Sequence, residues 1–314
     1  MSALTSHALK SHLAGLTLAS PLLNASGAFN PPMFNRLFPL QGTLGAIVTK
    51  TVTAQPRVGN AQYRTVELPG MGMLNSIGIQ NAGLAHFLET EGPGFAALGV
   101  PVILSISAES SEAFGAMAHA CREHANGSVV AAIELNLSCP NIHAGGVEFG
   151  SSPVMVREAV AAVKSVFDRP VFAKLTPNVG DMVPIAAGAL EGGADGLTAI
   201  NTLLGTHIDV KTRRPVLPRV SGGYSGPGVR PVALHHVYRL YQHFPGTPIL
   251  GVGGIATSED VLAFMMAGAS VVQVGTACFR DPMVFAHVHE ELRAWCAREG
   301  VAHLQDLVGC AQAH

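Results

Sequence analysis

Short runs of apolar and β-branched residues recur along the chain, and a polar or glycine-rich break follows each run. The runs are Pro21–Ala25, Gly45–Thr51, Val100–Ile106, Ala131–Leu137, Pro170–Thr176, Gly196–Asn201, Pro248–Gly253 and Val271–Thr276. Continuous apolar runs of this length are typical of strands that are buried on both faces. Helical patterns separate most of them, for example Pro153–Phe167, Met182–Gly192 and Ser258–Ala267. This alternation predicts parallel strands joined by helical crossovers.

Eight such runs predict an α/β fold, a single (β/α)8 TIM barrel. One domain would span residues 1–314, with a short N-terminal extension and long active-site loops. A doubly wound sheet is the alternative. The barrel is favoured because distinctive polar, lysine and glycine residues gather where the runs end, and a barrel builds its active site at the C-terminal ends of its strands.

Two connections are longer than a crossover requires, Thr53–Gly83 and Thr202–Arg230. Structureless loops of this length in a compact domain usually serve a site. We therefore expect both to contribute to the active site.

Composition narrows the class of protein. Apolar residues make up 48% of the chain and charged residues 13%, with a net charge of −2, so we expect a compact enzyme and no nucleic-acid partner. The chain has neither an unbroken apolar run long enough to span a membrane nor the features of a secretory signal, so we expect a cytoplasmic protein. None of the five cysteines forms a C-x-x-C pair, so we expect no metal site.

Glycines stand at the ends of the last two runs, in Gly253-Gly254 and in Gly275-Thr276. Barrel enzymes often bind phosphate through the loops after these two strands, and Ser225-Gly226 would add further donors. Used singly, such glycines would serve tight turns only. Their combination at these strands favours a phosphate site.

Two lysines and three asparagines accompany the glycines. Lys50 and Lys174 end apolar runs, where a lysine is costly to bury without an anion. Asn75, Asn136 and Asn201 offer paired donor and acceptor edges that suit a small planar imide or carboxylate. The alternatives are surface lysines and ordinary turn asparagines.

Cys139 lies between a predicted strand and a glycine-rich loop, in the segment ELNLSCPNIHAGGVEFG. A nucleophile, a metal ligand, a packed core thiol and a general base are all conceivable. No ligand spacing supports a metal, and cysteine is an accepted general base. The other cysteines, Cys121, Cys278, Cys296 and Cys310, are expected to be packing residues.

The segments ELNLSCPN and AGGVEFG resemble the catalytic-cysteine region of class 1 dihydroorotate dehydrogenases, in particular the class 1B catalytic subunit. The resemblance continues through LNSIGIQN, KLTPN, INTLLG, DVKTRRPVLPRVSGGYSGP, GVGGI and VGTACF, and covers roughly residues 13–285. It implies a barrel that carries FMN and oxidises dihydroorotate to orotate for pyrimidine synthesis. Cys139 would remove a proton from C5 while a hydride passes from C6 to flavin N5.

The same resemblance implies the site residues. Lys50 would contact both substrate and flavin, and a lid at Gly145-Gly146 would exclude water. The substrate would be bound by Lys50, Asn75, Asn136, Asn201 and Thr202 and by the backbone of Ser76, Ile77, Gly78 and Ile79. The FMN would be bound by Ser26, Lys50, Thr51, Ser105, Asn136, Lys174, Ile200, Gly226, Gly253, Gly254, Gly275 and Thr276.

Class 1B resemblance also implies partners. A second subunit with FAD and a [2Fe–2S] cluster would pass electrons to NAD⁺, and a homodimer of this chain would form the core of a heterotetramer. Ser105 departs from the asparagine usual in class 1B after the third strand, and the C-terminus LVGCAQAH matches poorly. Both departures concern the electron acceptor and subunit docking rather than the oxidation of the substrate.

Other flavin barrels are the rival interpretations. Class 1A enzymes share the cysteine but reduce fumarate, and membrane-associated class 2 enzymes use serine instead. A dihydropyrimidine-oxidising barrel is similar around SCPN, whereas a tRNA dihydrouridine synthase would need a basic surface that this chain lacks. A non-catalytic flavin- or phosphate-binding barrel is the remaining alternative.

Overall fold

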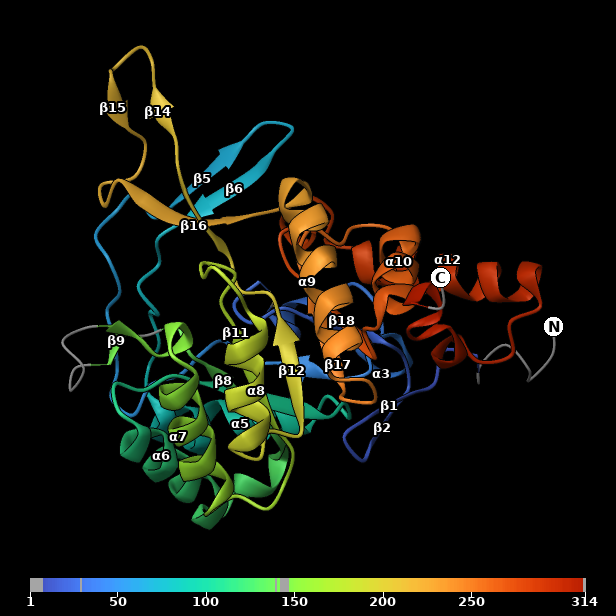
Figure 1. The fold of residues 1–314 in the computed structure, drawn as a ribbon, viewed down its shortest axis with the longest axis horizontal. Coiled ribbons are helices and arrows are strands. Elements are labelled where there is room, and N and C mark those ends of the chain that lie inside the picture. Colours follow the sequence, from blue (N-terminus) through green and yellow to red (C-terminus); the bar gives the residue numbers. More distant parts are fainter. Residues whose placement is uncertain (1–7, 29, 139, 142–146, 313–314) are drawn as a thin grey trace.

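The computed structural model describes residues 8–28, 30–138, 140–141 and 147–312 (Figure 1). Its centre is a sheet of eight parallel strands in the order β3-β18-β17-β12-β11-β8-β7-β4. The strands are β3 (Leu22–Asn24), β4 (Ile47–Val48), β7 (Val102–Ile106), β8 (Val130–Asn136), β11 (Val171–Leu175), β12 (Gly196–Ala199), β17 (Ile249–Val252) and β18 (Val271–Val274). Each coincides with one of the predicted runs, so the strand prediction is confirmed.

The two end strands of this sheet meet and close the barrel. Leu23 in β3 forms a parallel bridge with Ala46, just before β4. The Asn24 side chain extends this short seam, because its Nδ2 donates to the Val48 carbonyl at 2.7 Å and its Oδ1 accepts from the Val48 N–H at 3.0 Å. The barrel prediction is therefore confirmed, and the doubly wound alternative, which has open edges, is wrong.

Helices cover the outside of the barrel (Figure 1). The longer ones are α6 (Ser111–Glu123), α7 (Pro153–Lys164), α8 (Val183–Glu191), α9 (Arg230–His243), α10 (Ser258–Ala267) and α12 (Val284–Glu299). The shorter ones are α2 (Pro31–Phe34), α3 (Leu40–Thr43), α4 (Leu84–His86), α5 (Gly92–Ala96) and α11 (Ala277–Arg280). Serine or threonine caps begin three of the longer helices: Ser110 at α6, Ser152 at α7 and Thr257 at α10. The three helices predicted by periodicity are confirmed.

The N-terminal extension is a hairpin of β1 (Ser11–Leu13) and β2 (Leu16–Leu18). Its Leu13 and Leu18 pack with residues from the N-terminal halves of the barrel strands, including Ile103, Phe172 and Leu250. All five side chains are 0–1% exposed. This apolar layer fills the barrel at the end opposite the candidate site.

The two long connections are ordered, not structureless as expected. They form an antiparallel sheet in the order β13-β16-β6-β5 and a small hairpin of β14 and β15 that projects furthest from the barrel in Figure 1. The strands are β5 (Thr65–Leu68), β6 (Gly72–Asn75), β13 (Leu203–Thr206), β14 (Ile208–Asp209), β15 (Arg214–Pro215) and β16 (Ser221–Ser225). Between β8 and α7, β9 (Pro140–Asn141) pairs with β10 (Val147–Glu148).

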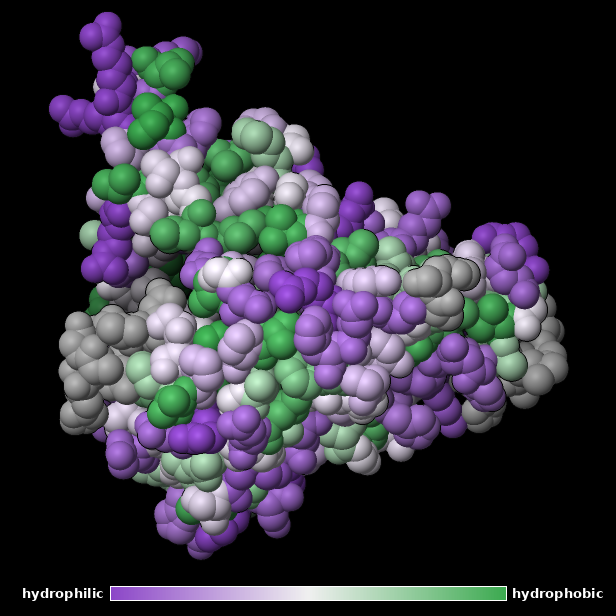
Figure 2. Space-filling model, viewed as in Figure 1, coloured by the Kyte–Doolittle hydropathy of each residue, from purple (hydrophilic) through white to green (hydrophobic). Residues whose placement is uncertain are grey.

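The surface in Figure 2 intersperses hydrophilic and hydrophobic residues, and the projecting hairpin carries both kinds. Val210 at its tip is 83% exposed. Within the described part of the chain, none of the helices combines the length and apolar character needed to cross a bilayer.

Candidate active site

A cavity of about 350 Å³ lies at the C-terminal ends of the barrel strands, below the antiparallel sheet. It brings together many of the residues singled out from the sequence. Those on its wall are Ser26, Lys50, Asn75, Ile77, Lys174, Ile200, Asn201, Thr202, Gly226, Gly253, Gly254, Gly275 and Thr276. They come from six barrel strand ends and from both long connections, so only the closed barrel assembles them.

The antiparallel sheet supplies wall residues that the sequence reasoning missed. Met73 from β6 and Tyr224 from β16 line the cavity, beside Ser225, which the sequence had already suggested as a phosphate donor. A second cavity of about 400 Å³ adjoins it, and the two share Met73, Gly226, Gly254, Thr276 and Phe279. The sequence signal for these strands is the alternation of apolar and polar residues in the long connections, and the many glycines there weaken it.

The glycines predicted to bind phosphate form one wall where backbone is close to backbone. Gly254 has φ of +76°, and a Cβ atom there would lie 2.9 Å from the Gly226 carbonyl oxygen. Asp260 fixes the loop that follows, because its carboxylate accepts from the N–H groups of Ala256 at 2.9 Å and Thr257 at 3.1 Å and pairs with Arg230. Glycine backbone in this part of the wall suits close approach of a phosphate group.

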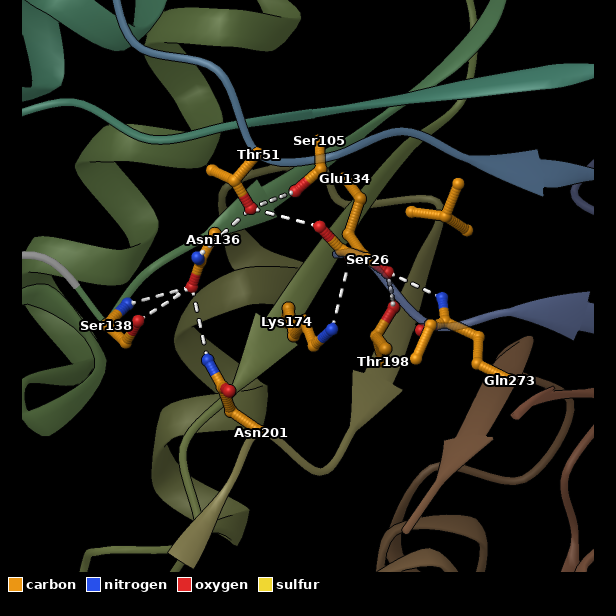
Figure 3. A network of polar contacts seen from close by, with 12 residues as sticks. Ser26, Thr51, Ser105, Glu134, Asn136, Ser138, Lys174, Thr198, Asn201 and Gln273 are labelled. Atoms are coloured by element: carbon orange, nitrogen blue, oxygen red, sulfur yellow. Dashed lines mark hydrogen bonds and ion pairs between the residues drawn. The ribbon is translucent and has the colours of Figure 1, made fainter. Parts of the chain in front are cut away.

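Lys174 reaches the cavity from inside the barrel, and its counter-ion is Glu134 (Figure 3). Glu134 is fully buried, and its Oε1 lies 3.5 Å from the lysine Nζ. The other carboxylate oxygen accepts from Thr198 Oγ1 at 3.0 Å and Gln273 Nε2 at 2.7 Å. The carboxylate thus compensates a buried cation while the ammonium still faces the cavity. A charged residue inside the apolar run AAIELNL was the sequence signal for Glu134.

Lys50, which follows β4, lines the same cavity. Partial burial, and secondly the positive charge of Lys174, lower the pKa of Lys50 below its ordinary value. Two cations that face one space favour an anionic or electron-rich ligand between them.

Three predicted cofactor contacts, Thr51, Ser105 and Asn136, do not line the cavity. They form a hydrogen-bonded network with residues that do (Figure 3). The Thr51 hydroxyl lies 2.9 Å from Ser105 Oγ and 3.1 Å from Ser26 Oγ, and Asn136 Nδ2 donates to it at 3.4 Å. Asn136 Oδ1 accepts from Asn201 Nδ2 at 3.1 Å. The network therefore orients the lining residues Ser26 and Asn201.

Ser76, Gly78 and Ile79 belong to the loop that continues from the lining residues Asn75 and Ile77. They do not themselves line the cavity. The predicted base and lid, Cys139, Gly145 and Gly146, lie outside the described residues. Among the described residues, no group of acidic, histidine and cysteine side chains is arranged to hold a metal ion.

Comparison with known proteins identifies relatives along almost the whole chain. The family model described as dihydroorotate dehydrogenase matches residues 8–295. A protein of Geobacillus kaustophilus (strain HTA426), named dihydroorotate dehydrogenase B (NAD(+)), catalytic subunit, is 45% identical over 95% of this chain and 93% of its own length. Proteins of the same name from Bacillus mycoides (strain KBAB4) and Bacillus caldolyticus are 43% and 44% identical, over 96% and 95% of this chain and 96% and 93% of their own lengths.

Proposed function

This chain belongs to the dihydroorotate dehydrogenase family, whose members are oxidoreductases, and from that premise we propose that it oxidises dihydroorotate to orotate with FMN as its cofactor. The observation that carries the proposal is the convergence of Lys50, Lys174, Asn75 and Asn201 on one cavity beside a glycine wall. A flavin needs those features: backbone donors for its phosphate, a cation beside its ring, and amides for the substrate stacked on it.

The residues present fit FMN. Gly253, Gly254, Gly275 and Thr276 would hold the phosphate, with the Thr276 hydroxyl already oriented by its 2.8 Å hydrogen bond to Ser225. Lys174 would lie beside the flavin ring, since it is the buried cation on the barrel side of the cavity. When bound, FMN supplies the hydride acceptor.

The protein's own groups would bind the substrate and move the proton. Asn75, Asn201 and Thr202 would hold the pyrimidine ring, and Lys50 would attract its carboxylate. Cys139, which follows Ser138 in the sequence, would take the proton from C5 as the hydride leaves C6. Proton and hydride together account for the conversion of dihydroorotate to orotate.

The names of the relatives support a proposal about the electron acceptor. Those proteins are called catalytic subunits of an NAD(+) enzyme, which implies a partner subunit. We propose that this chain forms a homodimer within a heterotetramer, and that the partner carries FAD and a [2Fe–2S] cluster and delivers electrons to NAD⁺. The class 1A alternative predicts instead that the chain alone reduces fumarate.

An anaerobic titration of the purified yellow protein with dihydroorotate tests the half-reaction. Dihydroorotate should bleach the visible flavin band, and Cys139→Ala should slow that bleaching by about 10²–10⁴-fold. Cys310→Ala, which removes an exposed thiol, serves as the matched control and should bleach at the wild-type rate. Bleaching by dihydrouracil and not by dihydroorotate would instead favour a dihydropyrimidine-oxidising enzyme.

A further inference from the structure

The loop of residues 76–80, which follows β6, has an unusual backbone. Gly78 has φ of +74° and Ile79 has φ of +52°. The left-handed region is open to glycine but is unfavourable for a β-branched residue such as isoleucine. A loop that keeps Ile79 in this conformation needs contacts that hold it there.

Two asparagines outside the predicted site supply such contacts. Asn60 Nδ2 donates to the Ser76 carbonyl at 3.0 Å, and the Asn60 N–H donates to the Ile77 carbonyl at 2.9 Å. Asn81 Nδ2 donates to the Ile79 carbonyl at 2.8 Å. The carbonyls of three of four consecutive residues are therefore turned toward asparagines.

Asn81 is itself anchored on the side away from Ile79. Its Oδ1 accepts from the Gly83 N–H at 2.8 Å and from the Thr53 N–H at 3.1 Å. Its backbone pairs with Arg57 in both directions, at 2.9 and 3.0 Å. Asn81 thus ties the loop to the start of the long connection that follows Lys50.

Turning the carbonyls outward has a consequence for the N–H groups. Within one trans peptide unit the C=O and N–H point in opposite directions. The carbonyls of Ser76, Ile77 and Ile79 therefore direct the N–H groups of the next residues, 77, 78 and 80, to the other side of the loop. No hydrogen-bond acceptor for these N–H groups occurs among the described residues. Lys50 shares one cavity with Ile77 and another with Gln80.

We propose that Asn81, assisted by Asn60, is a positioning residue that holds these backbone N–H groups ready for the carboxylate of the substrate. The inference rests on the proposed function, because it assigns the anionic end of dihydroorotate and orotate to this loop. Asn81 does not line the cavity assigned to substrate and cofactor. It acts by keeping Ile79 left-handed, so its loss lets the loop relax and turns the donors away.

The inference is tested by titrating the flavin-loaded protein with orotate and measuring binding through the change in the visible flavin spectrum. Asn81→Ala should raise the dissociation constant for orotate about tenfold, equivalent to about 1.4 kcal/mol. Asn126→Ala is the matched control, because Asn126 is half-buried like Asn81 and its side chain donates to the Leu88 carbonyl at 2.9 Å. Asn126 precedes the N-terminal end of β8, whereas the cavity lies at the C-terminal ends of the barrel strands. Asn126→Ala should lower the melting temperature comparably and leave orotate affinity unchanged.

A rescue variant separates positioning from general damage. Glycine adopts positive φ without steric cost, so Ile79→Gly combined with Asn81→Ala should restore orotate affinity to within about threefold of wild type. Orotate affinity of Asn81→Ala within twofold of wild type, or a double variant that binds no better than Asn81→Ala, would overturn the inference. Wild-type protein that retains flavin but does not bind orotate would refute the proposed function itself, and the inference with it.

Discussion

Glu134→Gln should destabilise the protein strongly, because it leaves Lys174 inside the barrel without a counter-ion. The Glu134 side chain is 0% exposed and that of Lys174 is 9% exposed, so little water is available to replace the lost carboxylate. Glutamine retains the shape of glutamate, so the change removes charge rather than volume. The amide also cannot accept from Thr198, Gln273 and Lys174 as the two carboxylate oxygens do.

The expected size follows from the geometry. At 3.5 Å, two unit charges in a medium of effective dielectric constant 20 attract by about 5 kcal/mol. Removal of one partner of a buried pair typically costs about 3–5 kcal/mol. For a chain of this length, that loss lowers the melting temperature by roughly 5–10 °C.

A double-mutant cycle isolates the pair. Lys174→Met should cost less than Glu134→Gln, because the carboxylate keeps its hydrogen bonds from Thr198 and Gln273. The double variant should be more stable than Glu134→Gln, since it has no uncompensated charge. Melting temperatures at two flavin concentrations allow the stabilisation by bound flavin to be subtracted.

The two single effects should not add to the effect of the double variant; agreement within about 0.5 kcal/mol would contradict a coupled ion pair. Additivity would mean that Glu134 and Lys174 stabilise the barrel independently. The hydrogen bonds from Thr198 and Gln273, rather than the ion pair, would then account for the burial of the carboxylate.

Two further predictions concern titratable groups. Partial burial, and secondly the charge of Lys174, lower the pKa of Lys50, so the folded state disfavours the charged form of this lysine. Lys50→Met should therefore raise the melting temperature at pH 7. The gain should vanish as the pH rises toward the ordinary lysine pKa of 10.5. A gain that does not change between pH 7 and 10 would contradict this. Burial raises the pKa of Cys121 to about 11 and that of Cys278 to about 12, whereas Cys310 is exposed. Iodoacetamide at pH 8 should therefore modify Cys310 at least about 100-fold faster than the two buried thiols, as followed by peptide mass spectrometry; equal labelling would show that the helices open readily.

Local sequence patterns were sufficient for the barrel strands and for three of the longer helices, α7, α8 and α10. Each barrel strand is buried on both faces, so its apolar run can be recognised without knowledge of its neighbours. The same local patterns placed Lys50, Lys174 and the glycines of the last two runs at strand ends, and barrel geometry then brings strand ends together. One local expectation was wrong: Cys310 is exposed rather than packed, because the turn that carries it lies on the surface.

Only the tertiary structure decided how the mouth of the barrel is built. Asn75 in β6 donates to the Gly223 carbonyl in β16, which is 148 residues away, and this pairing turns two presumed loops into one sheet. The hydrogen bonds of the Asn24 side chain with Val48 likewise join two separate strands at the barrel seam. The pairing of Asn81 with Arg57 joins two irregular parts of one long connection. A hydrogen bond between distant residues leaves no periodic signal in either segment, since each partner is selected by the other. The sequence therefore determined the barrel and its family, and the folded chain determined which residues of the long connections line the cavity.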